Sequence, residues 1–120
     1  LWLGMAVSAD GSLYVMDLEA ARVLKFNPEG QLDPLWGIAS KPSIGMNLAA
    51  SSRHLFLIDL GGLETDIWTL NGAHVGKFST NRGQLPTRGS FGQSLAISPK
   101  GELLILDAAN ARVLRFRVNL

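Results

Sequence analysis

The feature that most constrains the fold is a short apolar pattern that occurs three times along the chain. Leu13–Asp17 (LYVMD), Leu55–Asp59 (LFLID) and Leu103–Asp107 (LLILD) each place four largely apolar residues before an aspartate. The three aspartates are 42 and 48 residues apart. A period of about 45 residues is typical of a unit of four short β-strands, which buries its apolar faces only by stacking on its neighbours.

The first and third copies agree over a longer stretch than these five residues. A shift of 90 residues superposes them without a gap, matching Ala6 with Ala96, Ser8 with Ser98, Gly11 with Gly101, the ARVL of 21–24 with that of 111–114, and Phe26 with Phe116. The two copies therefore predict the same local structure.

Each copy predicts short strands that are separated by turn residues. We expect strands at 5–7, 13–16, 22–26 and 31–36 in the first copy, at 46–49, 55–58, 67–70 and 74–78 in the second, and at 95–97, 103–106 and 113–116 in the third. The 31–36 segment contains Pro34, which an edge strand tolerates. The prediction is an all-β chain of three consecutive four-stranded antiparallel units, at about 1–36, 37–85 and 86–120, the last lacking its outer strand.

Composition narrows the function classes. The chain has no cysteine, which excludes disulfides and thiolate zinc sites, and its two histidines are too few for a His-only metal cage. A net charge of +1 gives no overall attraction to nucleic acid or anionic lipid. The apolar runs are far shorter than the roughly 20 residues that span a bilayer. Because the chain begins without Met or a signal-peptide pattern, we expect a mature piece or a fragment.

The third copy, LAISPKGELLILDAANARVLRF, carries Asp107, Asn110 and Arg112 in a D-x-x-N-x-R-V pattern. It resembles the NHL repeat, and the first copy resembles it through LYVMD, ARVLKF and NPEG. The resemblance implies three blades of a six-bladed β-propeller. It specifies no activity, because one propeller scaffold carries many functions. The middle copy departs from the pattern by an insertion around Gly61 and by Asp66, which stands where the family has arginine.

Two charged pairs recur at the same repeat position. Asp17 and Asp107 end their strands, and Arg22 and Arg112 follow five residues later in each case. Such a carboxylate accepts amide hydrogens of a hairpin turn, and the arginine binds the carboxylate or turn carbonyls. Because repetition in successive blades is typical of a scaffold, we interpret these residues as structural rather than catalytic.

Ligand-binding residues are expected at the mouths of the central channel, where the innermost strands begin. The polar residues there are Asn47 in the second blade and Gln93 and Ser94 in the third. Similar propellers of the gluconolactonase and virginiamycin-lyase kinds use oxygen ligands at this place, but this chain has few carboxylates near those strands. We predict no metal site, and we expect no partner for His74.

One stretch has a local charge excess. From Ile67 to Gly101 there is no acidic residue, while Lys77, Arg82 and Arg88 lie within it. Some NHL proteins bind single-stranded RNA on a basic face, where such residues neutralise phosphate. A solvated loop is the favoured interpretation, so nucleic acid is not an expected partner.

Three functional hypotheses remain. The leading one is a non-enzymatic scaffold, without a cofactor, that presents loops for binding a protein or small ligand. The first alternative is part of a metal-dependent lyase or lactone hydrolase that uses a divalent cation such as calcium and has its other site residues on absent blades. The second is a single-stranded RNA-binding propeller.

Three blades make half of a six-bladed ring, so the first and last blades should each expose an apolar face. We expect these faces to include Val7, Tyr14, Ile97 or Ile105. Either a second copy of the chain or missing blades would then complete the ring.

Overall fold

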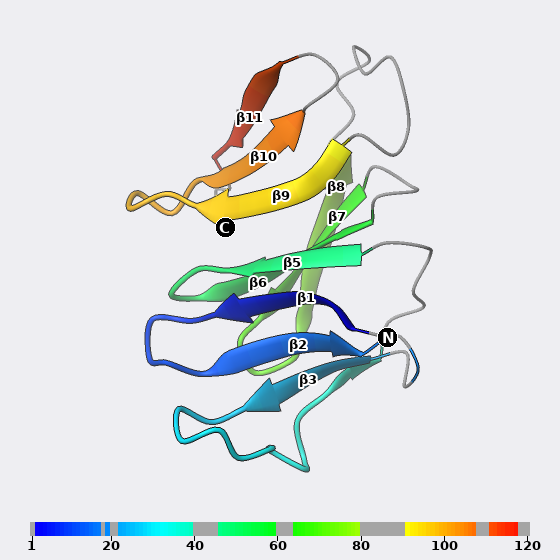
Figure 1. The fold of residues 1–120 in the computed structure, drawn as a ribbon, viewed down its shortest axis with the longest axis vertical. Coiled ribbons are helices and arrows are strands. Elements are labelled where there is room, and N and C mark those ends of the chain that lie inside the picture. The colour runs from blue at the N-terminus through cyan, green and yellow to red at the C-terminus, as the bar shows by residue number, and fades with distance from the viewer. Residues whose placement is uncertain are drawn as a thin grey trace.

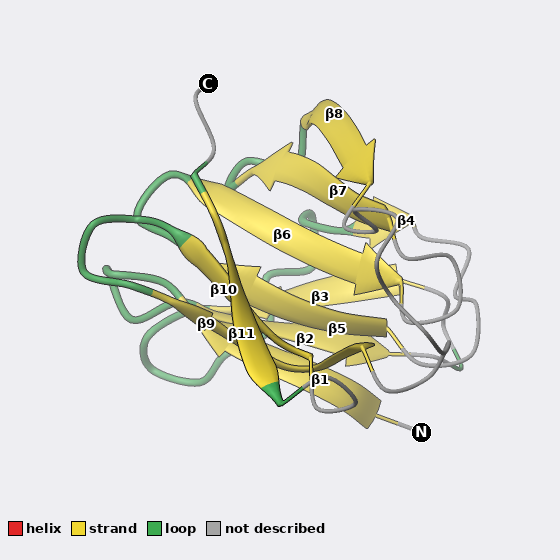
Figure 2. Ribbon diagram, turned by 90° about the horizontal axis from the view of Figure 1, so that it is seen from above, coloured by secondary structure: helices red, strands yellow, loops and turns green. Residues whose placement is uncertain are grey.

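Every regular element in the part of the chain that the structure describes is a β-strand. The structure is a computed structural model that describes residues 2–17, 19, 22–39, 46–59, 64–79, 91–107 and 111–117. Its strands are β1 (Trp2–Val7), β2 (Leu13–Asp17), β3 (Arg22–Phe26), β4 (Ile38–Ala39), β5 (Met46–Ala50), β6 (His54–Asp59), β7 (Glu64–Thr69), β8 (His74–Ser79), β9 (Phe91–Ile97), β10 (Leu103–Asp107) and β11 (Arg112–Phe116). Figure 2 shows strands and loops but no helix among the described residues, so none there could cross a membrane.

The strands form three antiparallel sheets, each of which follows the chain order. The sheets are β1-β2-β3-β4, β5-β6-β7-β8 and β9-β10-β11, and each is called a blade below. The blades are stacked along the long axis of the molecule, with the first strands β1, β5 and β9 side by side (Figure 1). The predicted all-β architecture of three repeat units is confirmed, and the third blade has three strands within the described residues.

Four hairpin turns share one five-residue geometry, at residues 8–12, 27–31, 69–73 and 98–102. In the first, the Ser8 amide donates to the Ser12 carbonyl at 2.9 Å and the Gly11 amide donates to the Ser8 carbonyl at 3.0 Å. The fourth position is glycine in every case, with φ between 81° and 90°. Because glycine adopts positive φ without a steric penalty, the spacing of these glycines predicts the turns.

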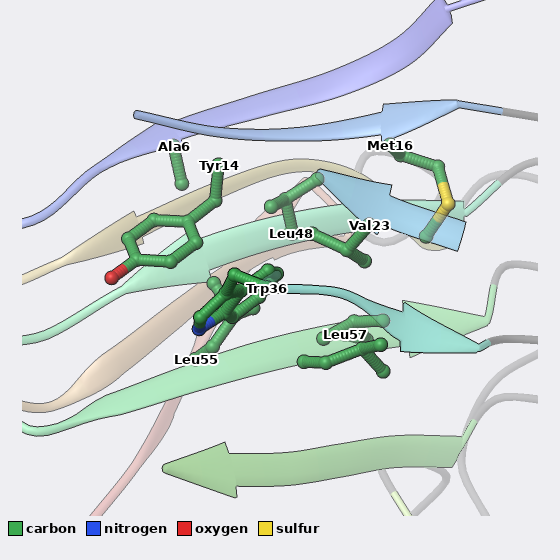
Figure 3. Close-up of a cluster of buried hydrophobic side chains, with 9 residues drawn as sticks. Ala6, Tyr14, Met16, Val23, Trp36, Leu48, Leu55 and Leu57 are labelled. Atoms are coloured by element: carbon green, nitrogen blue, oxygen red, sulfur yellow. The ribbon is translucent and has the colours of Figure 1, made fainter. Parts of the chain in front are cut away.

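Alternation along each strand gives every blade two apolar faces. We call the face turned toward the following blade the forward face and the opposite one the rear face. Tyr14 and Met16 lie on the forward face of the first blade, and Leu55 and Leu57 lie on the rear face of the second (Figure 3). The first cluster between blades contains Ala6, Tyr14, Met16, Val23, Trp36, Ile38, Leu48, Leu55 and Leu57.

A second cluster joins the second and third blades. Its buried members are Ala49, Phe56, Ile58, Ile67, Leu103, Ile105 and Phe116. Phe78 packs against this cluster, with its ring centroid 5.4 Å from that of Phe116. The middle blade is therefore buried on both faces, and the aromatic residues there serve the contact between blades.

The predicted membership of the exposed faces is partly wrong. Val7 is 59% exposed, as expected, but Tyr14 is only 1% exposed, Ile105 is fully buried, and Ile97 is partly buried against the second cluster. The reason is the strand pleat, which sends neighbouring residues to opposite faces. Tyr14 and Ile105 lie on the faces that contact the middle blade.

The outer strand of the first blade lies later than predicted. It is Ile38–Ala39, which pairs with β3, whereas only Leu32 of the predicted 31–36 segment forms an isolated bridge, to Phe26. Pro34 cannot donate an amide hydrogen, and the Asp33 carboxylate accepts the Leu35 amide at 3.1 Å in a turn. Trp36 then turns inward, and its indole N–H donates to the Leu70 carbonyl of the second blade at 2.9 Å.

Candidate functional site

The three innermost strands share a polar or small position near their beginnings. Gly4 in β1, Asn47 in β5 and Ser94 in β9 each lie two residues before an alanine of the repeat, Ala6, Ala49 or Ala96. In Figure 1 these strands begin at the right, at the end opposite the turns that follow them. Residues at this position therefore lie on adjacent strands at one end of the stack.

Pairing of the inner strands is irregular at this position in two of the blades. In β1 the register shifts between Trp2 and Gly4, and in β9 the partners of Ile105 and Asp107 are Leu95 and Phe91. Three residues of β9, including the predicted site residues Gln93 and Ser94, thus lie opposite Leu106 alone. Such bulges re-aim side chains and are over-represented beside functional sites.

Asn47 lies against the first blade. Its side-chain oxygen accepts the amide hydrogen of Leu48 at 2.9 Å, and the residue is half-buried. A Cβ at position 4 would lie 2.9 Å from this oxygen and 2.8 Å from Leu48 Cδ2, so glycine is needed for the approach of β1 to β5. The side chains of Gln93 and Ser94 lie outside the described residues.

In the first and third blades, the recurrent Asp of the second strand is the register partner of the recurrent Arg of the third strand. Asp17 is the register partner of Arg22, and Asp107 is that of Arg112. The Asp17 carboxylate accepts the Glu19 amide hydrogen at 3.1 Å, as a turn carboxylate does.

The Arg22 guanidinium lies against the backbone of Gly37, where any Cβ would collide with it. Glycine at position 37 thus leaves room for the arginine beside β4. The Asp107 side chain lies outside the described part of the chain.

The middle blade replaces the arginine with an acid. The register partner of Asp59 is Glu64, whereas Asp66 pairs with Leu57, so the assignment of Asp66 to the arginine position is wrong by two residues. The sequence insertion around Gly61 concealed this register. Glu64 instead forms an ion pair with Lys77 of β8, at 3.3 Å between Oε2 and Nζ.

This ion pair bears on the predicted basic loop. Lys77 is exposed, but its charge is compensated within the blade by Glu64. Arg82 and Arg88 lie outside the described residues.

His74 has partners that the sequence did not reveal. Its Nε2 lies 3.0 Å from Asp66 Oδ1, and its ring meets the Trp68 ring edge-on at 4.7 Å between centroids. The expectation that His74 lacks a partner is therefore wrong. Its partners come from β7 because β8 pairs with that strand, a contact eight residues back that no local pattern signals. No group of three or more metal-ligating side chains occurs within the described residues.

The turn at residues 8–12 contains an acid whose pKa is lowered. The Ser8 hydroxyl donates to Asp10 Oδ1 at 2.5 Å, and the Ser12 amide donates to the same oxygen at 2.9 Å. These hydrogen bonds lower the pKa of Asp10 from 3.8 to about 2. The carboxylate is committed to holding its own turn, which is a structural role.

An apolar hollow of about 300 Å³ lies on the forward face of the third blade. It is lined by Leu95, Ala96, Leu104, Leu106 and Val113. The lining offers no charged side chain, so its chemistry suits apolar contact rather than catalysis or ion binding.

Comparison with solved structures agrees with this architecture. Hydrazine synthase of Kuenenia stuttgartiensis matches 95% of the chain at 10% identity with a TM-score of 0.63. Virginiamycin B lyase of Staphylococcus aureus matches 99% of the chain at 12% identity with a TM-score of 0.59. A calcium-binding protein, regucalcin, of Agrobacterium tumefaciens matches 88% of the chain at 18% identity with a TM-score of 0.57. No protein-family model and no curated protein matches the chain.

These neighbours are propeller-type proteins, and the chain is a β-propeller segment of three consecutive antiparallel blades. The match spans 34%, 42% and 37% of the three neighbours' lengths, respectively. At identities this low the likeness concerns the fold alone.

Proposed function

We propose that the chain is part of a six-bladed, NHL-type propeller that acts as a binding scaffold for a protein or a small ligand. The observation that supports this is that Asn47 and Ser94 occupy the same repeat position on the adjacent inner strands β5 and β9. Gln93 precedes Ser94 in β9, where the strand pairing is bulged. In the proposed ring these positions lie at one end of the central channel, where propellers gather their loops. The ring is completed by a second copy or by further blades.

Binding at this end of the channel is tested by NMR with the isotope-labelled chain. The probes are monosaccharides, amino acids and short-chain lactones, added one at a time. Binding should shift the amide signals of residues 46–48 and 92–95, and Asn47→Ala should weaken it by about tenfold, the equivalent of one lost hydrogen bond. The matched control is Asn71→Ala in an exposed turn, which should bind normally. Amide shifts confined to other strands, or an equal loss of affinity in both variants, would refute the proposal.

The first alternative is a portion of a metal-dependent lyase or lactone hydrolase. Its support is that the similar solved structures include a lyase and a calcium-binding protein. The remaining ligands would then come from blades beyond these three. Calorimetric titration of a polypeptide that carries all the blades with Ca²⁺ alone separates the two proposals, because stoichiometric calcium binding favours the enzyme and its absence favours the scaffold.

The second alternative, single-stranded RNA binding, is weaker because Glu64 compensates Lys77. It predicts that an oligouridine binds with a steep dependence on salt, and that Arg82→Ala and Arg88→Ala each reduce that slope. RNA binding that is absent or insensitive to salt removes this alternative.

A further inference from the structure

Two apolar faces lack a neighbouring blade among the described residues. One is the rear face of the first blade, where Met5 and Val7 are exposed. The other is the forward face of the third blade, where Leu106 and Val113 are exposed beside the apolar hollow. Exposed apolar patches of this kind mark interaction surfaces.

The forward face of the third blade has a buried counterpart within the same chain. The shift of 90 residues relates Ala96, Leu104, Leu106 and Val113 to Ala6, Tyr14, Met16 and Val23. All four counterparts are buried in the first cluster, against Leu48, Leu55 and Leu57 of the second blade. Within the chain, the equivalent face of the first blade is thus covered by the rear face of the second blade.

The rear face of the first blade also has a buried counterpart. The same shift relates Met5, Val7, Leu13, Val15 and Phe26 to Leu95, Ile97, Leu103, Ile105 and Phe116. Each of these residues of the third blade is buried in, or packed against, the second cluster. The first blade therefore presents to solvent the kind of surface that the hollow of the third blade fits.

We infer that the hollow on the third blade binds the rear face of the first blade of a second copy of this chain. This contact would repeat, between two molecules, the packing that already joins the blades within one. In two copies related by a two-fold axis, the third blade of each copy contacts the first blade of the other. The two contacts use all four faces and close a ring of six blades. The inference develops the ring completion proposed above and is independent of ligand binding at the channel end.

Light scattering coupled to size exclusion tests the dimer. The wild-type chain at about 100 µM should have twice the monomer mass of 12.9 kDa. Val7→Arg and Val113→Arg should each give monomers, because a charge buried without a partner opposes the contact. Both residues are 59% exposed in the single chain, so the fold should tolerate arginine, which circular dichroism checks. Leu35→Arg is the matched control, since Leu35 is 97% exposed and outside both faces, and it should remain dimeric.

Mixing the two monomeric variants tests which faces meet. An equimolar mixture of Val7→Arg and Val113→Arg retains one intact pair of faces, so it should form a heterodimer that neither variant forms alone. If instead like faces met each other, one of the two variants would remain dimeric by itself, which would overturn the inference. Masses that grow beyond the dimer would overturn the closed ring.

A wild-type chain that stays monomeric at about 100 µM would also overturn the inference. The partner of the two faces would then be a further blade of a longer polypeptide. Neither result affects the NMR test of ligand binding, which monitors residues at the beginnings of β5 and β9.

Discussion

At the scale of single residues, the Asp10 carboxylate makes the stability of the fold depend on pH. Its hydrogen bonds with Ser8 and Ser12 favour the ionised form and lower its pKa to about 2. Because the folded pKa lies below the unfolded value of 3.8, this group stabilises the fold above about pH 3.8. The stabilisation is lost as the pH falls from 3.8 toward 2.

The variant Asp10→Asn tests this linkage, because the amide keeps an acceptor oxygen and removes the charge. We expect wild type to exceed the variant in free energy of unfolding near neutral pH and the difference to vanish as the pH falls below about 2. Urea denaturation at a series of pH values measures both. A difference that stays constant across this range would show that charge plays no part in the turn.

Backbone conformation at single glycines allows a second, matched comparison. Gly30 has a φ of +85° and Gly76 lies within β8, and no atom lies within 4 Å of an added Cβ at either position. Gly30→Ala should therefore cost about 1 kcal/mol through left-handed strain alone, while Gly76→Ala should be neutral or slightly stabilising. Urea midpoints report the two effects, and equal shifts in both variants would contradict the assignment of strain to φ.

At the scale of elements, the sequence predicts what depends on local pattern. The repeat, the glycine turns and ten of the strands follow from residue types at short spacing, and they agree with the structure to within a few residues. The position of β4 differs because Trp36 packs on the second blade, a contact 34 residues away in sequence. The pairing of Glu64 with Asp59 was hidden by the insertion before it.

The site could be predicted only in part, for the same reason. Residue types predict a polar position at Asn47 and Ser94, because position along a repeat is a local property. No local pattern indicates that Gly4 makes room for Asn47, because that contact joins two blades. Burial of Tyr14 and Ile105 likewise depends on which face of each blade a neighbouring blade covers.

The close approach of β1 and β5 leads to a third prediction. In Gly4→Ala the new methyl group would lie 2.8 Å from Leu48 Cδ2, and Leu48 is buried in the first cluster. Because packed cores yield little to added volume, we expect a loss on the order of 1–3 kcal/mol. Gly76→Ala again serves as the control, and thermal unfolding of both variants gives the comparison. An unchanged midpoint for Gly4→Ala would show that β1 moves freely against β5.

At the scale of the whole molecule, the described residues cover both faces of the middle blade and one face of each end blade. Equivalent residues should therefore differ in their contribution to stability according to blade. Ile58 and Leu106 occupy the same repeat position on forward faces, but Ile58 is fully buried against the third blade and Leu106 lies at the exposed hollow. The two residues thus report separately on packing within one chain and on packing between copies.

Truncation at these two positions gives the last prediction. Ile58→Ala should cost about 2–5 kcal/mol at any chain concentration, because its cavity opens inside one molecule. Leu106→Ala should cost less than about 1 kcal/mol at low concentration, where the chain is monomeric and the residue is partly solvated. At about 100 µM the cost should rise toward that of Ile58→Ala, because a second copy covers the hollow and dimerisation stabilises the folded state by mass action. Thermal unfolding of both variants at about 1 µM and about 100 µM measures these effects. Equal costs of Leu106→Ala at the two concentrations would show that no second copy occupies the hollow.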